Sequence, residues 1–122
     1  MELKPDCMRD VLLAVEAAPL DRYLTETELS ECLPQWGKDD IVYSCIQLGK
    51  AKYLEVEVKN FIRARKGVVV RDLTPQGHQA LNQIRKNTVW NRAKEIAKKT
   101  GKAGIVFLAD IAKDVIASGF TG

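Results

Sequence analysis

The hydrophobic pattern of this chain changes from helical spacing to strict alternation near the middle, and this change is the strongest constraint on the fold. In the first fifty residues apolar side chains recur every three or four positions, as in amphipathic helices. Residues 53–58 (YLEVEV) alternate with period two, and residues 68–73 (VVVRDL) are rich in β-branched side chains. We therefore predict a hairpin with residues 59–67 (KNFIRARKG) at its tip. Its register stays open, because either pairing sets one charged residue, Arg71 or Asp72, on the apolar face.

Three helices are predicted before the hairpin, over about residues 6–18, 26–33 and 39–51. Thr25 and Glu28 have the spacing of a capping box at the start of the second helix. The inward positions of the second and third helices are assigned to Leu29, Cys32, Leu33, Ile41, Cys45 and Leu48. The outward positions of the third are assigned to Tyr43, Ser44, Gln47 and Lys50.

More helix is predicted after the hairpin. Thr74 and Pro75 form a good cap and first-turn pair, and Asn87 or Thr88 starts a further helix that stops at Gly101. The last segment, 105–120, has more apolar surface than one helical stripe needs. Packing against the first helix or against a second copy of the chain would cover it, and we predict a homodimer through the C-terminal helices.

This order of elements is that of a winged helix-turn-helix. The fold class is mainly α with a small β-hairpin. Residues 1–74 form the winged helix-turn-helix core, with the wing at 53–73, and residues 75–122 form a helical C-terminal extension packed on it. At 122 residues the whole is one structural domain.

Charge is distributed unevenly along the chain. Residues 1–50 hold ten acidic and five basic side chains, for −5, whereas residues 51–122 hold six acidic and fourteen basic ones, for +8. The positive field therefore belongs to the second half of the chain.

Several function classes have no support in the sequence. Cys7, Cys32 and Cys45 form no CxxC pair and are interpreted as core residues, and His78, the only histidine, as a surface or capping residue. No phosphate-binding loop or HExxH motif occurs. We expect no catalytic site, no metal and no cofactor. The start lacks the pattern of a signal peptide and no apolar run is long enough for a membrane span, so a cytoplasmic protein with no membrane contact is expected.

The segment LTPQGHQALNQIRKNTVWNRAKE (73–95), with MRDVLLAVE and IVYSCIQLGKAKYL, carries a resemblance. The segment contains a Leu-Thr, Gly-His and Ile-Arg pattern, formed by Leu73, Thr74, Gly77, His78, Ile84 and Arg85. A Thr-aliphatic-Trp-Asn signature closes it, formed by Thr88, Val89, Trp90 and Asn91. The chain resembles an uncharacterised family of small winged-helix proteins, a domain of unknown function found mainly in bacteriophages and bacterial mobile elements. The resemblance implies the fold and the source but no site residues. Lys52 departs from the pattern, which usually has Gly there.

We expect a non-catalytic DNA-binding or regulatory protein. The wing residues Lys59, Arg63, Arg65 and Lys66 suit a minor groove or phosphates of double-stranded DNA, and Tyr43, Ser44, Gln47 and Lys50 would face base edges or phosphates. Asp39 and Asp40 oppose this docking, because carboxylates at a helix start repel phosphates. The basic later helices would then contribute, through Arg85, Lys86, Arg92, Lys94, Lys98, Lys99 and Lys102.

A protein partner is the alternative. Phe61 and Ile62 sit among the charges at the predicted wing tip, where exposed apolar groups are typical of an interface. On this interpretation the chain binds a host protein and no DNA. A third interpretation needs no partner: Phe61 and Ile62 fold back onto the domain, and the four charges only keep the hairpin tip soluble.

Overall fold

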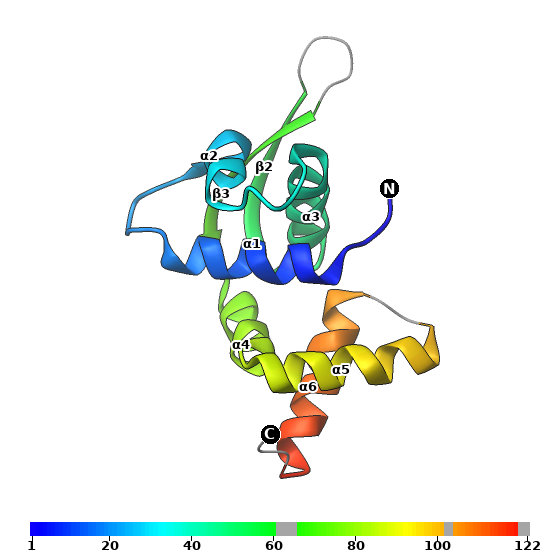
Figure 1. Ribbon diagram of the computed structural model, residues 1–122. Helices are drawn as coiled ribbons and strands as arrows, with labels where there is room; N and C mark the ends of the chain where they lie inside the picture. Colours follow the sequence, from blue (N-terminus) through cyan, green and yellow to red (C-terminus); the bar gives the residue numbers. More distant parts are fainter. Residues whose placement is uncertain (61–65, 102–103, 120–122) are drawn as a thin grey trace.

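The computed structural model describes residues 1–60, 66–101 and 104–119. The elements in chain order are α1 (Pro5–Ala17), β1 (Leu24–Thr25), α2 (Glu26–Cys32), α3 (Lys38–Lys50), β2 (Leu54–Asn60), β3 (Lys66–Leu73), α4 (Pro75–Ile84), α5 (Asn87–Thr100) and α6 (Ile105–Ala117). Helices α1 to α3 lie around the base of the projecting β2–β3 hairpin, and α4 to α6 lie on the opposite side of α1 (Figure 1). The predicted mainly helical chain with a central hairpin is confirmed for these residues.

The hairpin belongs to a three-stranded antiparallel sheet of order β1-β3-β2. Strand β1, which the sequence analysis missed, pairs Leu24 with Val70, and its two residues are too few to show an alternating pattern. Beyond β1, the backbone N–H of Val68 donates to the Glu26 carboxylate at 2.5 Å. Glu26 thus satisfies an edge group that β1 does not reach.

A β-bulge settles the register of the hairpin. Glu55 pairs with Asp72 but Val56 pairs with Val70, so Arg71 is the extra residue. Val70 and Leu73 can therefore both be buried although they are three residues apart, because a bulge shifts the alternation by one position. Arg71 stays exposed and donates to Glu57 at 2.8 Å.

The turn from α3 into β2 keeps a left-handed residue without glycine. Lys52 has φ +65°, and the backbone N–H groups of Lys52 and Tyr53 donate to the carbonyls of Gly49 and Leu48 at 3.0 Å each. This is a Schellman motif, whose left-handed position glycine usually fills. The chain therefore makes this turn with a side chain at the position, at a cost of about 1 kcal/mol.

The base of the hairpin is tied to the start of α4. Thr74 caps the helix by accepting from the Gly77 N–H at 2.9 Å, and its own N–H donates to the Tyr53 carbonyl at 3.0 Å. Gly77 lies so close to the backbone of Tyr53, just before β2, that a Cβ on Gly77 would be 2.2 Å from the Tyr53 carbonyl oxygen. Only glycine fits this junction without displacing backbone.

One hydrophobic core runs through the described residues. Helix α1 contributes Cys7, Met8, Val11, Leu12 and Val15, one face at helical spacing. Cys45 is buried as predicted, but Cys32 is exposed, so its assignment to the core was wrong. Leu29 and Leu33 lie four positions apart and take the inward positions instead, which leaves Cys32 to the side.

The last three helices pack on one another. Helix α6 contacts α4 and α5, and it buries Ile105, Leu108, Ala109, Ile111, Ala112 and Val115. Trp90 of α5 is the largest of the fully buried side chains. This packing buries one stripe of the last segment, mainly against α4 and α5 where the first helix was one expected partner, and leaves Val106 and Ile116 exposed at 46% and 43%.

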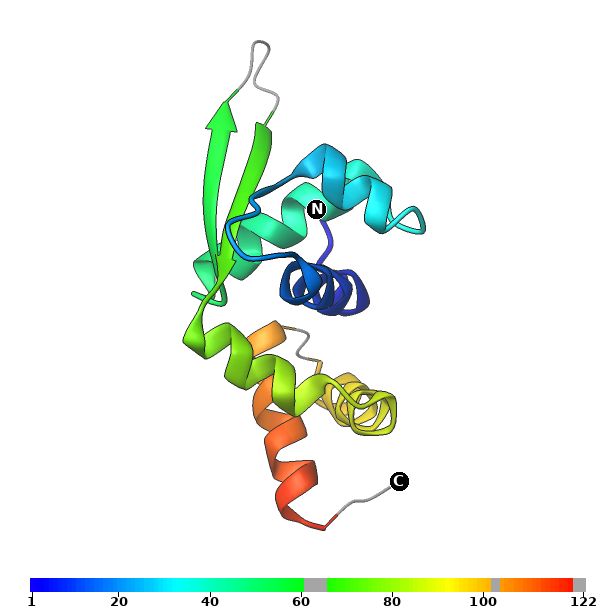
Figure 2. The same ribbon diagram turned by 90° about the vertical axis from the view of Figure 1, so that its left-hand side faces the viewer.

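Arg9 joins the two parts of the chain. Its guanidinium donates to the Ile84 and Arg85 carbonyls at 2.9 and 2.5 Å, and to the Asn87 side chain at 2.8 Å. These carbonyls end α4 and have no partner inside that helix. Arg9 also lies 5.6 Å from the Trp90 ring centroid. The side view (Figure 2) shows α1 nearly end-on, above α4 and α5.

None of the helices in the described ranges has the length and apolar content that crossing a lipid bilayer requires.

Candidate nucleic-acid interface

The outer side of α3 holds three of the four residues assigned to it. Lys50 is exposed, and Tyr43 and Gln47 are half-buried. Ser44 is only 3% exposed, so its assignment to the surface was wrong. The buried residues of α3 are Ile41, Ser44, Cys45 and Leu48, an i, i+3, i+4, i+7 stripe, so Ser44 falls in the inward row despite its hydroxyl.

Ser44 faces the thiol of Cys7 across the α1–α3 contact. Burial raises the pKa of Cys7, and the hydrogen bond with Ser44 offsets part of this effect. Burial also raises the pKa of Cys45 to about 12. These side chains belong to the core and are removed from any candidate interface.

The acidic start of α3 is partly neutralised. Asp40 accepts from the Lys4 ammonium at 3.0 Å, and its side chain is 18% exposed. That hydrogen bond raises the pKa of Lys4. Asp39 is exposed. One of the two carboxylates that oppose phosphate binding therefore already has a cation beside it.

The far end of the hairpin is cationic on both faces. Lys59 and Lys66 are exposed, and neither forms an ion pair with any residue that the structure describes. Lys66 pairs with Asn60, so it lies on the opposite face of the hairpin from Lys59. The predicted wing residues Arg63 and Arg65, together with Phe61 and Ile62, lie outside the described residues.

The base of the hairpin adds a second pair of lysines. Lys50 ends α3 and Lys52 occupies the left-handed turn; both are exposed and without an ion pair among the described residues. Sequence reasoning missed Lys52, although its place where the family pattern has Gly was the available signal. Strand β2 separates the two lysine pairs by about 23 Å, the rise of its seven residues.

The middle of the hairpin is net negative, because the exposed carboxylates of Glu55, Glu57 and Asp72 outnumber the single guanidinium of Arg71. The Arg71 guanidinium donates to Glu57, which lowers the pKa of that carboxyl and raises that of Arg71. Arg71 also lies 5.6 Å from the ring centroid of Tyr23. Both partners are about half exposed, so this pair adds little to stability. Its effect is to remove one arginine from the free positive charge of the hairpin.

Several basic residues of the later helices are also neutralised. Arg85 makes a two-point contact with Glu16, Lys94 donates to Asp6, and Arg92 pairs with Glu95. Lys86, Lys98 and Lys99 are exposed and have no ion pair within the described ranges, and Lys102 lies outside them. The expected basic surface of the extension is thus reduced to scattered lysines.

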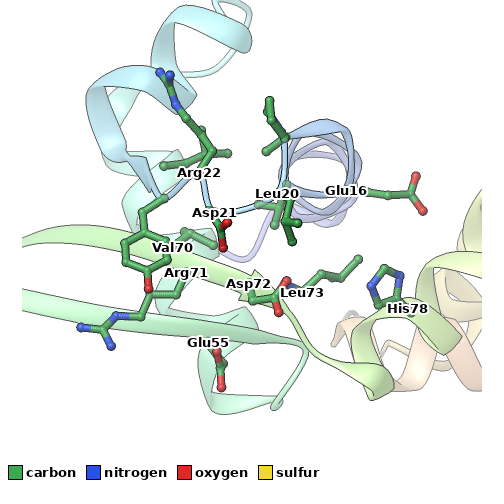
Figure 3. Close-up of a pocket in the computed structure, with 15 residues that line it drawn as sticks. Glu16, Leu20, Asp21, Arg22, Glu55, Val70, Arg71, Asp72, Leu73 and His78 are labelled. Atoms are coloured by element: carbon green, nitrogen blue, oxygen red, sulfur yellow. The ribbon is translucent and has the colours of Figure 1, made fainter.

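A cavity of about 470 Å³ lies between the end of α1, the following loop and strand β3. Leu20, Asp21 and Asp72 lie around it, with His78 of α4 at one side (Figure 3). His78 is exposed, as predicted for a surface histidine. In the described part of the chain no three His, Cys, Asp or Glu side chains are grouped as a metal site.

These observations define a mainly helical protein with a small three-stranded antiparallel sheet, in which exposed lysines mark both ends of a projecting hairpin. The model of the family described as "Hypothetical protein (DUF2513)", an uncharacterised domain of unknown function, matches residues 2–103. The chain belongs to this family. No curated protein matches it. No solved structure matches it either.

Proposed function

We propose that the chain is a winged-helix protein of phage or mobile-element origin that binds double-stranded DNA through α3 and the β2–β3 hairpin. The order α1-β1-α2-α3-β2-β3 with sheet order β1-β3-β2 supports the winged-helix assignment, since it places a helix before a hairpin that extends beyond the body. The resemblance in residues 73–95 supports the origin.

The observation that carries the DNA proposal is the placement of the four lysines. Lys50 and Lys52 lie at one end of the hairpin, and Lys59 and Lys66 at the other, with no ion-pair partner among the described residues. A separation of about 23 Å equals the rise along the duplex axis of about seven phosphates of one strand. Ammonium groups at this spacing bind phosphates with little dependence on sequence.

The contact with base edges is the weaker part of this interface. Tyr43 and Gln47 are half-buried, and Asp39 is exposed at the leading end of α3. Groove-reading helices usually use their N-terminal residues. We therefore expect affinity to come mostly from phosphates, and to fall steeply as salt is raised.

Fluorescence anisotropy with a labelled duplex of generic sequence tests the proposal at low and moderate salt. A variant with Lys50, Lys59 and Lys66 changed to Ala is compared with a matched variant in which Lys86, Lys99 and Lys113 of the extension are changed to Ala. Removing three phosphate contacts lowers the salt slope by about 3 and weakens binding at least tenfold at low salt.

The matched variant keeps the wild-type affinity if the hairpin lysines hold the DNA. Equal loss in both variants would mean that total charge, and no particular surface, attracts the duplex. Absence of binding at low salt would leave the alternative, a protein-interaction module without DNA. At the wing tip that alternative rests on Phe61 and Ile62, which are outside the described residues.

A further inference from the structure

Helix α1 has a second apolar row that the core buries only in part, with Leu13 and Ala14 half-buried and Ala17 exposed. Leu13, Ala14 and Ala17 follow Asp10 at i+3, i+4 and i+7, on a different side of the helix from the core row. They lie along a groove of about 720 Å³ between α1 and α2, together with Leu24 and Leu33. Ala14 and Ala17 are small, so another backbone can come close to α1 along this row.

Negative charge surrounds this groove. Its lining holds three carboxylates, Asp10, Glu28 and Glu31, against one guanidinium, Arg22. Arg22 is already paired with Glu28. Glu31 is exposed and has no ion pair among the described residues.

The backbone adds negative potential to the same place. Helices α1 and α2 both end at the groove, at Ala17 and Cys32, and neither has a basic residue in its last turn. The C-terminus of a helix carries about half a negative charge, which a nearby cation normally offsets. The two ends lie at different places along the groove, since Gln35 after α2 donates to Asp10 and α1 ends two turns further on at Ala17, and neither end has a basic residue of its own.

From this complementarity we infer that the α1–α2 groove binds a basic amphipathic helix of a partner protein. The apolar side of that helix packs on Leu13, Ala14 and Ala17, and its Lys or Arg residues reach Glu31 and the two helix ends. DNA does not fit this surface, because phosphates would face carboxylates. The groove shares no residue with α3, β2 or β3, so the inference stands independently of the proposed DNA binding.

The test uses the full chain and three labelled peptides of about 15 residues, a length that spans four helical turns. The first has Leu at i, i+3, i+4 and i+7 spacing and Lys on its flanks. The second has the same composition in an order that breaks the apolar row. The third has Glu in place of Lys. Binding is followed by fluorescence anisotropy at low salt.

We expect saturable one-to-one binding of the first peptide, and at least about fivefold weaker binding of the other two. Ala17→Arg and Glu31→Lys should each weaken the first peptide at least about fivefold, because both place a cation in the groove. The matched variants Ala117→Arg and Glu95→Lys change exposed positions on α6 and α5 in the same way, and should bind as the wild type does. Circular dichroism confirms that each variant is folded.

Equal binding of the ordered and reordered peptides would overturn the inference, as would binding that neither Ala17→Arg nor Glu31→Lys weakens. Sedimentation tests whether a second copy of the chain occupies the groove instead. Self-association that Ala17→Arg abolishes, with no peptide binding, would assign the groove to that second copy and would also overturn the inference. The triple lysine variant of the hairpin separates the two proposals, since it should lose DNA and still bind the first peptide.

Discussion

Replacing Gly77 by Ala tests the junction between the hairpin and α4. An added Cβ would lie 2.2 Å from the Tyr53 carbonyl oxygen and 2.7 Å from Leu73 Cδ1. The Leu73 methyl can move, but the Tyr53 oxygen is backbone and accepts the hydrogen bond of Thr74. The substitution therefore pushes α4 and the start of β2 apart.

The magnitude follows from two opposing effects. Restoring van der Waals contact needs a backbone displacement of about 1 Å in a close-packed interior, and overpacking of this kind costs about 3 kcal/mol or somewhat more. Alanine in place of a helical glycine returns about 1 kcal/mol. We expect a net loss of about 2–3 kcal/mol in the free energy of unfolding, or a Tm about 8–12 °C lower for a chain of this size.

Thermal and urea unfolding measure this loss, and Gly49→Ala is the matched control. Gly49 also lies inside a helix near β2, but its added Cβ would meet Val56 at 3.4 Å, an ordinary contact. That variant should be unchanged or up to about 1 kcal/mol more stable. If Gly77→Ala proves as stable as Gly49→Ala, the close approach of α4 to Tyr53 is not a feature of the folded protein.

Four further outcomes are expected. Lys52→Gly should raise the free energy of unfolding by up to about 1 kcal/mol, seen as a higher urea midpoint, because glycine adopts the left-handed backbone conformation without the steric cost of a side chain. An unchanged or lower midpoint would contradict the strained turn. A thiol reagent should titrate Cys32 rapidly in the native protein and all three cysteines in denaturant, since burial raises the pKa of Cys45 to about 12 and also raises that of Cys7; rapid reaction of all three in the native state would refute this. Burial alone would raise the pKa of Asp6, but hydrogen bonds from Lys94 and Trp90 outweigh it and lower the pKa. The ionised Asp6 therefore stabilises the folded state above the unfolded pKa of about 3.9, and this stabilisation is lost as pH falls through the lower folded pKa. The difference in free energy of unfolding between wild type and Asp6→Asn should accordingly shrink in urea melts below about pH 4. The predicted homodimer should appear in sedimentation at tens of micromolar, and a monomer there would exclude it.

Periodicity predicted the helices and the hairpin, since each has enough residues to show a repeat. The same reasoning failed where the signal is short. Strand β1 has two residues and exists because β3 offers it a partner. The bulge at Arg71 was invisible for a related reason: the sequence records the conflict between Arg71 and Asp72 but not which residue is left out of the ladder.

The candidate interface was predicted in part. Exposure of Lys50, Lys59 and Lys66 agrees with their assignment, because long charged side chains are rarely buried. Ser44 was misplaced, since a hydroxyl was taken as a sign of the surface although a neighbouring thiol satisfies it inside. Ion pairs such as Arg85 with Glu16 join residues far apart in the chain, so charge counting alone overstated the free positive surface.

The contact of Arg9 with the end of α4 has a consequence for how the chain is made. The donor and its first acceptor are 75 positions apart. In a nascent chain that has released only its first half from the ribosome, α1 can already pack on α3, but the Arg9 guanidinium has no helix end to cap until α4 follows. We expect folding to be completed late in synthesis, as one event for both parts of the molecule.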